Sequence, residues 1–468
     1  MRRESENTAP MNESFEAQTI HPIPAGQRHG RASDLFAVWF SANMTLLTVV
    51  TGALGPALFG LSLLWSLVAL VIGNAVGAVF MALHAAQGPR LGVPQMVQSR
   101  GQFGVYGSVP VIVLVVLMYI GFAASNCVVG GEALSQVLPV LHGVKGVALI
   151  AVLTLIPCVL GYRAIHMCSK LASWVSALGV LYAIMCGFGR LSWGLLTDTH
   201  GSVAGFLGAL SVSALWQIAY APYVSDSSRY LPNQQAAARQ AFGATYGGTV
   251  LGAILPMILG SLLAISWPGA SITGSLLHLS GSLGGVIVLI LALAIPLANA
   301  MSVYCGALCS LTLVQTLRPH WHFGFVARLN ATVLLLGAAL WMSLGMAGDF
   351  FKAYTAFLDI LMAVLVPWTA INLTDYYLLK QGDYDVKAFF AADGGPYGLL
   401  NGRAVVSYVI GVLVEIPFLK TGPYTGFLVS AVHGIDVSWI VSLGVTTGVY
   451  GLWYWLQEGH AQHSVGEL

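Results

Sequence analysis

Twelve apolar runs of roughly 20 residues each dominate the sequence, and they constrain its fold more than any other feature. An α-helix needs about 20 mostly apolar residues to cross the hydrocarbon core of a bilayer. Only 8% of the 468 residues are charged, whereas a soluble globular protein carries about 25%, so most of the surface must face lipid. The sequence therefore predicts an all-α polytopic membrane protein with about twelve transmembrane helices.

The order of charges along the chain tests this number of spans. The expected spans are 34–60, 61–84, 106–131, 146–162, 169–189, 205–226, 241–266, 284–312, 327–348, 353–379, 403–419 and 438–457. With a cytosolic N-terminus, fifteen of the 19 Lys and Arg fall on the cytosolic side, and the outer side receives only Lys145, Arg190, Lys352 and Lys420. This agrees with the positive-inside rule and predicts that both termini are cytosolic.

The segments outside the spans indicate the location and the partners of the chain. Residues 1–33 are polar, lack an apolar core and are predicted to be a disordered cytosolic tail rather than a signal peptide; residues 458–468 are the expected cytosolic C-terminal tail. The net charge of +1 argues against a nucleic-acid partner. Short loops favour a bacterial inner membrane, and the oligomeric state leaves no signal in the sequence.

Other function classes are not supported by the motifs. The cysteines Cys305 and Cys309 lie four residues apart, as a metal pair would, but we interpret them as packing residues and predict no metal centre. Paired carboxylates or a nucleophile with a base, which a membrane enzyme would need, are not recognisable. An ATP-driven pump would need a GxxxxGK[ST] loop, which the sequence lacks.

Two of the expected spans contain residues that break helices. Ser41, Asn43 and Thr45 cluster in the first span, and short polar side chains compete with helical backbone hydrogen bonds. Pro222 lies in the sixth span and cannot donate a backbone hydrogen bond. The sixth span lies five spans after the first. Since a unit of five helices crosses the membrane an odd number of times, a second copy of this unit must be inverted in the membrane. This predicts an inverted-repeat transporter with broken helices 1 and 6, with a proline kink and helix packing as the alternative.

Polar and aromatic side chains at depth predict a ligand site. Buried amides are costly unless paired, and an amide offers a donor and an acceptor side by side, as the edge of a heterocyclic base requires. Aromatic rings can stack on the flat face of such a base. The alternative for each residue is helix packing. The predicted substrate-binding residues are Asn43, Phe122, Asn126, Trp216, Tyr220, Asn299 and Ser302.

Four stretches resemble the nucleobase–cation symporter family, the purine–cytosine permeases that include allantoin and hydantoin transporters. They are DLFAVWFSANM (34–44), GPRLGVPQMVQSRGQFGVYG (88–107), YAPYVSDSSRYLP (220–232) and PWTAINLTDYYLLKQGDYDV (367–386). The resemblance implies two inverted five-helix repeats, 34–189 and 205–379, followed by two additional helices in 403–457. It also implies import of a flat heterocycle with a proton or sodium ion by alternating access. The alternative function is a permease of the same fold for a non-nucleobase ring (allantoin, hydantoin or vitamin-like). A membrane enzyme is a less favoured alternative.

The resemblance also implies residue roles. Phe122 and Asn126 look like the aromatic–amide pair of the third helix, with Phe replacing the usual Trp, and Asn299 looks like the amide of the eighth helix. Ala221 occupies the place of a second stacking aromatic residue, with Tyr220 and Trp216 nearby.

The eighth span favours one coupling ion over the other, although backbone carbonyls alone remain an alternative set of sodium ligands. Sodium-coupled relatives carry hydroxyls shortly before the eighth-helix amide, whereas residues 289–298 contain none. Since a hard cation prefers oxygen ligands, we expect proton coupling rather than sodium, and no other cofactor. The candidate residues for ion coupling are Asp359, inside the tenth span, and Ser41.

Overall fold

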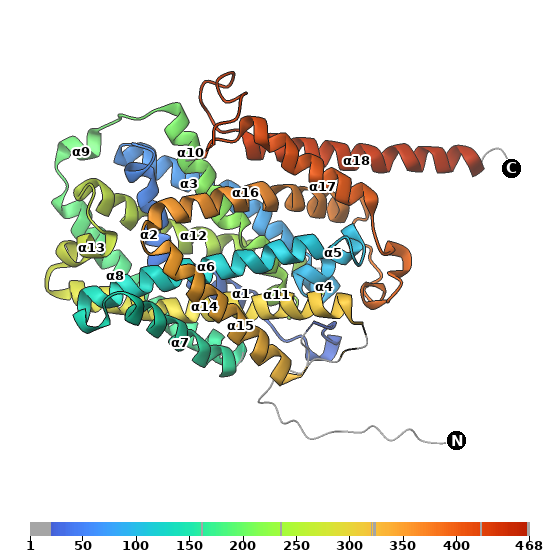
Figure 1. Cartoon of the computed structure of the whole chain (residues 1–468), viewed down its shortest axis with the longest axis horizontal. Coiled ribbons are helices and arrows are strands. Elements are labelled where there is room, and N and C mark those ends of the chain that lie inside the picture. Colours follow the sequence, from blue (N-terminus) through green and yellow to red (C-terminus); the bar gives the residue numbers. More distant parts are fainter. Residues whose placement is uncertain are drawn as a thin grey trace.

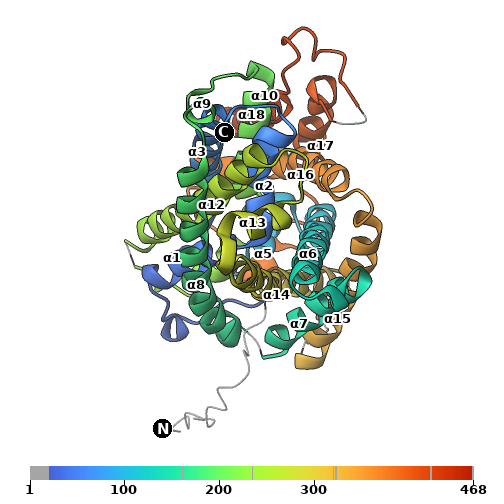
Figure 2. The same ribbon diagram turned by 90° about the vertical axis from the view of Figure 1, so that its left-hand side faces the viewer.

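The chain folds into a bundle of helices that run mostly along one long axis (Figure 1), and a view turned by 90° shows many of them end-on (Figure 2). The computed structural model describes residues 20–465, with gaps at 161, 235, 320, 322, 323, 422 and 423. The short helices α4 and α5 lie at one end of the bundle, and α9 and α13 lie at the opposite end (Figure 1).

The helical elements follow one another along the chain, with the longest connections before and after α17. Their bounds are α1 Ala32–Asn43, α2 Leu46–Ala57, α3 Leu63–Ala85, α4 Gly88–Leu91, α5 Gln95–Phe103, α6 Val109–Val137, α7 Val144–Leu160, α8 Tyr162–Arg190, α9 Trp193–Thr197, α10 Val203–Ile218, α11 Val224–Ser228, α12 Ala237–Ser266, α13 Ile272–Ser280, α14 Gly284–Leu317, α15 Phe325–Met346, α16 Phe350–Leu373, α17 Gly402–Glu415 and α18 Ser438–Val465. A 3₁₀ turn, η3 (Ala221–Tyr223), precedes α11, and a π-helix, η5 (Thr374–Leu379), continues α16.

The protein is an all-helical, multi-pass membrane protein. Among the described residues, eight helices are long and apolar enough to cross a membrane, and nine if α1 and α2 form one span. Each of the twelve predicted segments is occupied by a helix. Three of these helices, α7, α17 and α18, are not among the nine that are long and apolar enough to cross a membrane. Since α7 has 17 residues and α17 has 14, these two are shorter than a straight span requires.

Both predicted helix interruptions are present. α1 and α2 are bent by 61° at a break that begins at Met44, next to the polar residues Ser41, Asn43 and Thr45. α10 ends at Ile218, and the chain passes through η3, which contains Pro222, into α11. The first interruption separates two half-helices, whereas the second is a local change to a 3₁₀ turn within one continuous span, Val203–Ser228.

The helices that carry the interruptions are packed closely. α12 lies along both α1 and α2, α3 lies along α10, and α14 lies along α6 and α8. A Cβ atom on Gly77 of α3 would be only 2.2 Å from the carbonyl oxygen of Ala214 in α10. Small residues permit such close backbone approach, which fixes the half-helices relative to their neighbours.

The two terminal segments differ from the prediction. Residues 20–31 are packed rather than disordered, because Ile20 and Ile23 are buried and the Arg28 guanidinium donates to the carbonyl oxygens of Ile23 (2.9 Å) and Pro89 (2.6 Å). The rest of the predicted 1–33 tail, residues 1–19, lies outside the described residues. At the other end, α18 continues to Val465 instead of ending near 457, since no proline follows the apolar run.

Candidate functional site

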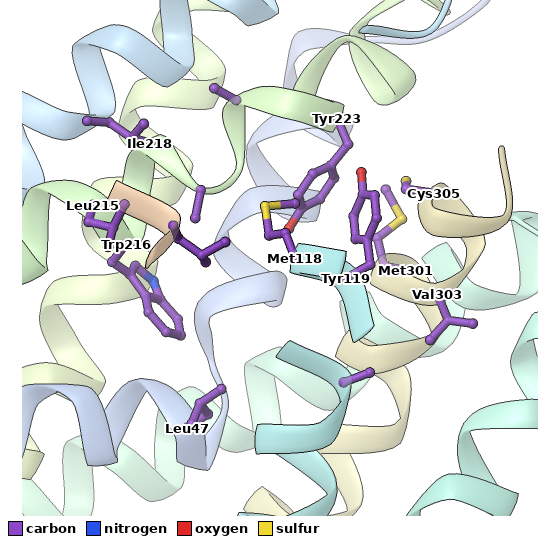
Figure 3. Packing of buried hydrophobic residues seen from close by; sticks show 14 of the residues in the cluster. Leu47, Met118, Tyr119, Leu215, Trp216, Ile218, Tyr223, Met301, Val303 and Cys305 are labelled. Carbon is purple, nitrogen blue, oxygen red and sulfur yellow. The ribbon is translucent and has the colours of Figure 1, made fainter. Parts of the chain in front are cut away.

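A cavity lies where the break between α1 and α2 faces α6, α10 and α14. Its cavity volume is about 30 Å³, enough for only one or two water molecules, so the side chains of the wall must move apart to admit a ring. Figure 3 shows Leu47, Trp216 and Met301, three residues of its wall, on three different helices. The complete wall consists of Ala42, Thr45, Leu47, Phe122, Asn126, Trp216, Ala219, Tyr220, Tyr223, Ala298, Met301 and Ser302.

Three of the predicted aromatic residues form one side of this cavity. The ring of Trp216 lies edge-to-face with the rings of Phe122 and Tyr220, with centroid distances of 6.0 Å in both pairs and interplanar angles of 88° and 82°. Phe122 is held from behind by Phe357 of α16, at a centroid distance of 5.1 Å. An aromatic wall of this kind can hold a flat ring by stacking or edge contacts.

The predicted amides of α6 and α14 form a pair, of which one member lines the cavity. Asn126 Nδ2 donates to Asn299 Oδ1 at 2.9 Å, and Asn299 Nδ2 donates to the carbonyl oxygen of Ala123 at 3.4 Å. Asn299 is fully buried behind the wall, whereas Asn126 is part of it. The Oδ1 atom of Asn126 has no protein partner, so this residue can accept a hydrogen bond from a ligand.

The predicted amide of α1 lies behind Trp216. Asn43 is fully buried and does not line the cavity; its Oδ1 accepts a hydrogen bond from Trp216 Nε1 at 2.6 Å. Its neighbours Ala42 and Thr45 line the cavity instead, because the break in the helix turns this part of the backbone toward the ligand space. Direct substrate contact by Asn43 stays a prediction.

Ser302 lines the cavity as predicted, and Tyr223 joins it without having been predicted. Tyr223 is the last residue of η3 and packs against Tyr220 and Trp39, with centroid distances of 5.7 Å in both cases. In a regular helix Tyr220 and Tyr223 lie within one turn, but the path of the chain around Pro222 decides whether both reach the same space. Pro222 was the one feature of the sequence that could have indicated that Tyr223 reaches the cavity.

A second cavity of about 30 Å³ adjoins the first, with Ala42, Ala298 and Met301 common to both walls. It is lined by the predicted ion-coupling residue Ser41, whose Oγ donates to Ser173 Oγ of α8 at 2.7 Å. The other candidate for ion coupling, Asp359, is half-buried in α16 and lines neither cavity. The structure thus places Ser41 next to the aromatic cavity and Asp359 elsewhere.

Residues 22–442 match the family model described as "Permease for cytosine/purines, uracil, thiamine, allantoin". The chain is 38% identical over 446 residues to the Bacillus subtilis protein named "Putative purine-cytosine permease YxlA", covering 93% of this chain and 95% of that protein. It is 25% identical to the purine-cytosine permease fcyB of Emericella nidulans, covering 91% of this chain and 85% of the relative.

Two solved transporters share the fold. The nucleobase-cation-symport-1 family transporter Mhp1, in a closed conformation with bromovinylhydantoin bound, aligns with a TM-score of 0.77 at 16% identity, covering 95% of this chain and 96% of Mhp1. A Na⁺-coupled sialic acid symporter aligns with a TM-score of 0.60 at 13% identity, covering 94% of this chain and 92% of that protein.

Proposed function

The chain belongs to the cytosine and purine permease family, and from this premise we propose that it is a symporter that imports a nucleobase or a related flat heterocycle with a cation. It is a membrane transporter and not an enzyme. The observation that carries the proposal is the cavity at the helix breaks, which combines an aromatic wall with the unpaired acceptor of Asn126.

The chemistry of the cavity fits a planar ring that bears N–H groups. Phe122, Trp216 and Tyr220 offer aromatic surface, and Asn126 Oδ1 can accept from a ring N–H or an exocyclic amine. The hydroxyl of Ser302 can donate or accept, which suits the mixed edge of a base. The alternative substrate is a ring outside the nucleobases, such as allantoin, a hydantoin or a vitamin-like ring. This alternative is supported by Phe122, whose ring is smaller than the Trp expected from the resemblance.

The proposed transport cycle is alternating access. We infer twelve spans, with 34–189 and 205–379 as inverted repeats and 403–457 as two additional helices, in a bacterial inner membrane with both termini in the cytosol. The interrupted helices α1–α2 and α10–α11 would bind substrate near the midplane, and rocking of one group of helices against the other would open the cavity to either side in turn.

The proposed coupling ion is the proton. The helix α14 contributes only Ala294, Leu297, Ala298 and Met301 to the second cavity, so it offers no hydroxyl to a sodium ion there. The hydroxyls in this wall, Ser41, Ser169 and Ser173, come from α1 and α8. A hard cation prefers several oxygen ligands, and the lack of a hydroxyl from α14 in this wall supports proton coupling. Asp359 remains the proposed proton carrier.

Uptake of radiolabelled cytosine, hypoxanthine, uracil and allantoin by cells that express the protein tests the proposal. We expect saturable uptake of at least one compound, abolished by a protonophore and unchanged when sodium is removed. Dependence on sodium would refute proton coupling and leave the substrate proposal intact. Absence of uptake of all four, with the protein present in the membrane, would move the substrate outside this group.

A matched pair of tryptophan variants checks that the cavity is responsible. Trp216→Ala should abolish saturable uptake, because it removes the central ring of the aromatic wall. Trp341→Ala should leave uptake unchanged, because Trp341 lies on α15 with 80% of its surface exposed. Equal loss in both variants would contradict the assignment of the site.

A further inference from the structure

The orientation of Trp216 depends on residues that do not touch the cavity. An indole ring has a single polar hydrogen, and in Trp216 this hydrogen is directed to Asn43 Oδ1 at 2.6 Å. Trp216 therefore presents only carbon atoms to a ligand. Because Asn43 is fully buried, its own position is set by the groups that hold its Nδ2 atom.

These groups form a chain of hydrogen bonds through four helices. Asn43 Nδ2 donates to Thr249 Oγ1 of α12 at 3.2 Å, and Thr249 Oγ1 donates to Gln217 Oε1 of α10 at 2.5 Å. Gln217 Nε2 in turn donates to Asn74 Oδ1 of α3 at 2.6 Å. The chain of bonds runs in one direction from Trp216 to Asn74, and it links α1, α10, α12 and α3.

The other side-chain N–H groups of this hydrogen-bond network also have acceptors. The second hydrogen of Asn43 Nδ2 is directed to the carbonyl oxygen of Trp39, and that of Gln217 Nε2 to the carbonyl oxygen of Thr249. Asn74 Nδ2 donates to the carbonyl oxygen of Leu70 and contacts Met257 Sδ at 3.1 Å. A buried network in which every member is satisfied is rigid, and it resists rotation of any one side chain.

We propose that Asn74, Gln217 and Thr249 are positioning residues for substrate recognition, which hold Asn43 and thereby fix the indole ring of Trp216 in the cavity wall. The inference rests on the proposed function, in that the aromatic cavity is the substrate site. It assigns a role in binding to three fully buried residues that lie outside the wall. Loss of one link leaves the ring free to tilt, which lowers the affinity for a flat ligand without removing any wall atom.

Three threonine variants on α12 separate positioning from general packing. Thr249→Val keeps the shape of the side chain but removes the hydroxyl, so it should raise the KM for uptake about tenfold and leave Vmax nearly unchanged. Thr249→Ser keeps the hydroxyl and should restore the original KM. Thr245→Val is the control, because Thr245 is fully buried one turn earlier on α12 and its hydroxyl has no partner. An unchanged KM in Thr249→Val, or an equal rise in Thr245→Val, would overturn the proposal.

A second measurement does not depend on the substrate. In protein labelled with 5-fluorotryptophan, the fluorine resonance that is missing from Trp216→Phe identifies Trp216. This resonance should shift or broaden in Thr249→Val and stay in place in Thr249→Ser and Thr245→Val. If it does not move in Thr249→Val, the network does not position the ring. Should the wild type transport none of the tested compounds, the substrate lies outside that group, while the fluorine spectra still decide the positioning role. If Thr249→Val does not reach the membrane, Asn74→Leu cuts the same chain and must give the same results.

Discussion

At the scale of single residues, the hydrogen-bond partners of each amide decide what it can offer to a ligand. Asn126 uses its Nδ2 group on Asn299 and keeps Oδ1 unpaired, so it presents an acceptor. Asn43 uses its side-chain oxygen and both side-chain hydrogens inside the protein. Two residues of the same type, both predicted to bind substrate, therefore have different surroundings: one in the wall and one behind it.

Replacement of Asn126 tests the acceptor. Asn126→Leu should raise the KM for uptake about tenfold or more, because a substrate N–H then loses its partner and Asn299 Oδ1 loses its donor. Ser125→Ala is the control: Ser125 is a buried neighbour whose hydroxyl donates to the carbonyl oxygen of Gly121. Uptake kinetics at equal surface expression are the measurement. Equal KM values in both variants would contradict a role for Asn126 in binding.

Asp359 is tested as the proton carrier by neutralisation. Asp359→Asn should strongly reduce uptake driven by a proton gradient and leave the amount of protein in the membrane unchanged, because an amide cannot release a proton during the cycle. Asp383→Asn, in the exposed connection after η5, serves as the control. Normal concentrative uptake in Asp359→Asn would exclude Asp359 as the proton carrier.

At the scale of helices, close backbone contacts position the interrupted segments. A Cβ atom on Gly260 of α12 would lie 1.8 Å from the carbonyl oxygen of Val49 in α2, and one on Gly252 would lie 2.8 Å from that of Phe40 in α1. α12 therefore holds both halves of the broken helix through positions where only hydrogen fits. The same helix carries Thr249 three residues before Gly252, and its hydroxyl accepts a hydrogen bond from Asn43 of α1.

Two glycines of α12 provide a matched stability test. Gly260→Ala should destabilise the protein by about 1–3 kcal/mol, because the added methyl group overpacks the contact with α2. Gly243→Ala should be neutral or stabilising by up to about 1 kcal/mol, because a Cβ atom there meets no neighbour within 4 Å and alanine favours the helix. Thermal unfolding of purified protein in detergent measures both. A lower melting temperature for Gly243→Ala than for Gly260→Ala would contradict this packing.

At the scale of the whole molecule, the two ends of the bundle differ in charge and structure. α4 and α5 lie at one end together with the connection that follows η5, and this end carries most of the Lys and Arg of the loops (Figure 1). The end with α9 and α13 carries few. The positive-inside rule predicts that the first end faces the cytosol.

Reporter fusions test this orientation. Green fluorescent protein fused after Leu468 should be fluorescent, because it folds in the cytosol. Alkaline phosphatase inserted in residues 198–202, between α9 and α10, should be active, because it needs the oxidising outer side. The same phosphatase inserted in residues 391–394, after η5, should be inactive. Phosphatase activity at the second position and not at the first would invert the topology and the direction of the proposed transport.

The sequence by itself determined the class of the protein, the positions of its helices and the two interruptions. These properties depend on local composition: apolar length decides where a helix can cross lipid, and Pro222 or the group around Asn43 decides where a helix breaks. The family resemblance, carried by four stretches of sequence, is confirmed by the comparisons. Residues 20–31 and the extension of α18 were missed, because contacts with distant elements or the absence of a stop signal decide them.

Only the tertiary structure decided which of the predicted residues share one cavity. Phe122, Asn126, Trp216, Tyr220 and Ser302 meet there, with Tyr223 added. Asn43 and Asn299 lie behind them, and Asp359 lies apart. A sequence gives the depth of a side chain in the membrane, but its direction depends on the rotation of its helix and on the neighbours that take up its hydrogen bonds. For that reason the network through Thr249, Gln217 and Asn74 left no signal in the sequence.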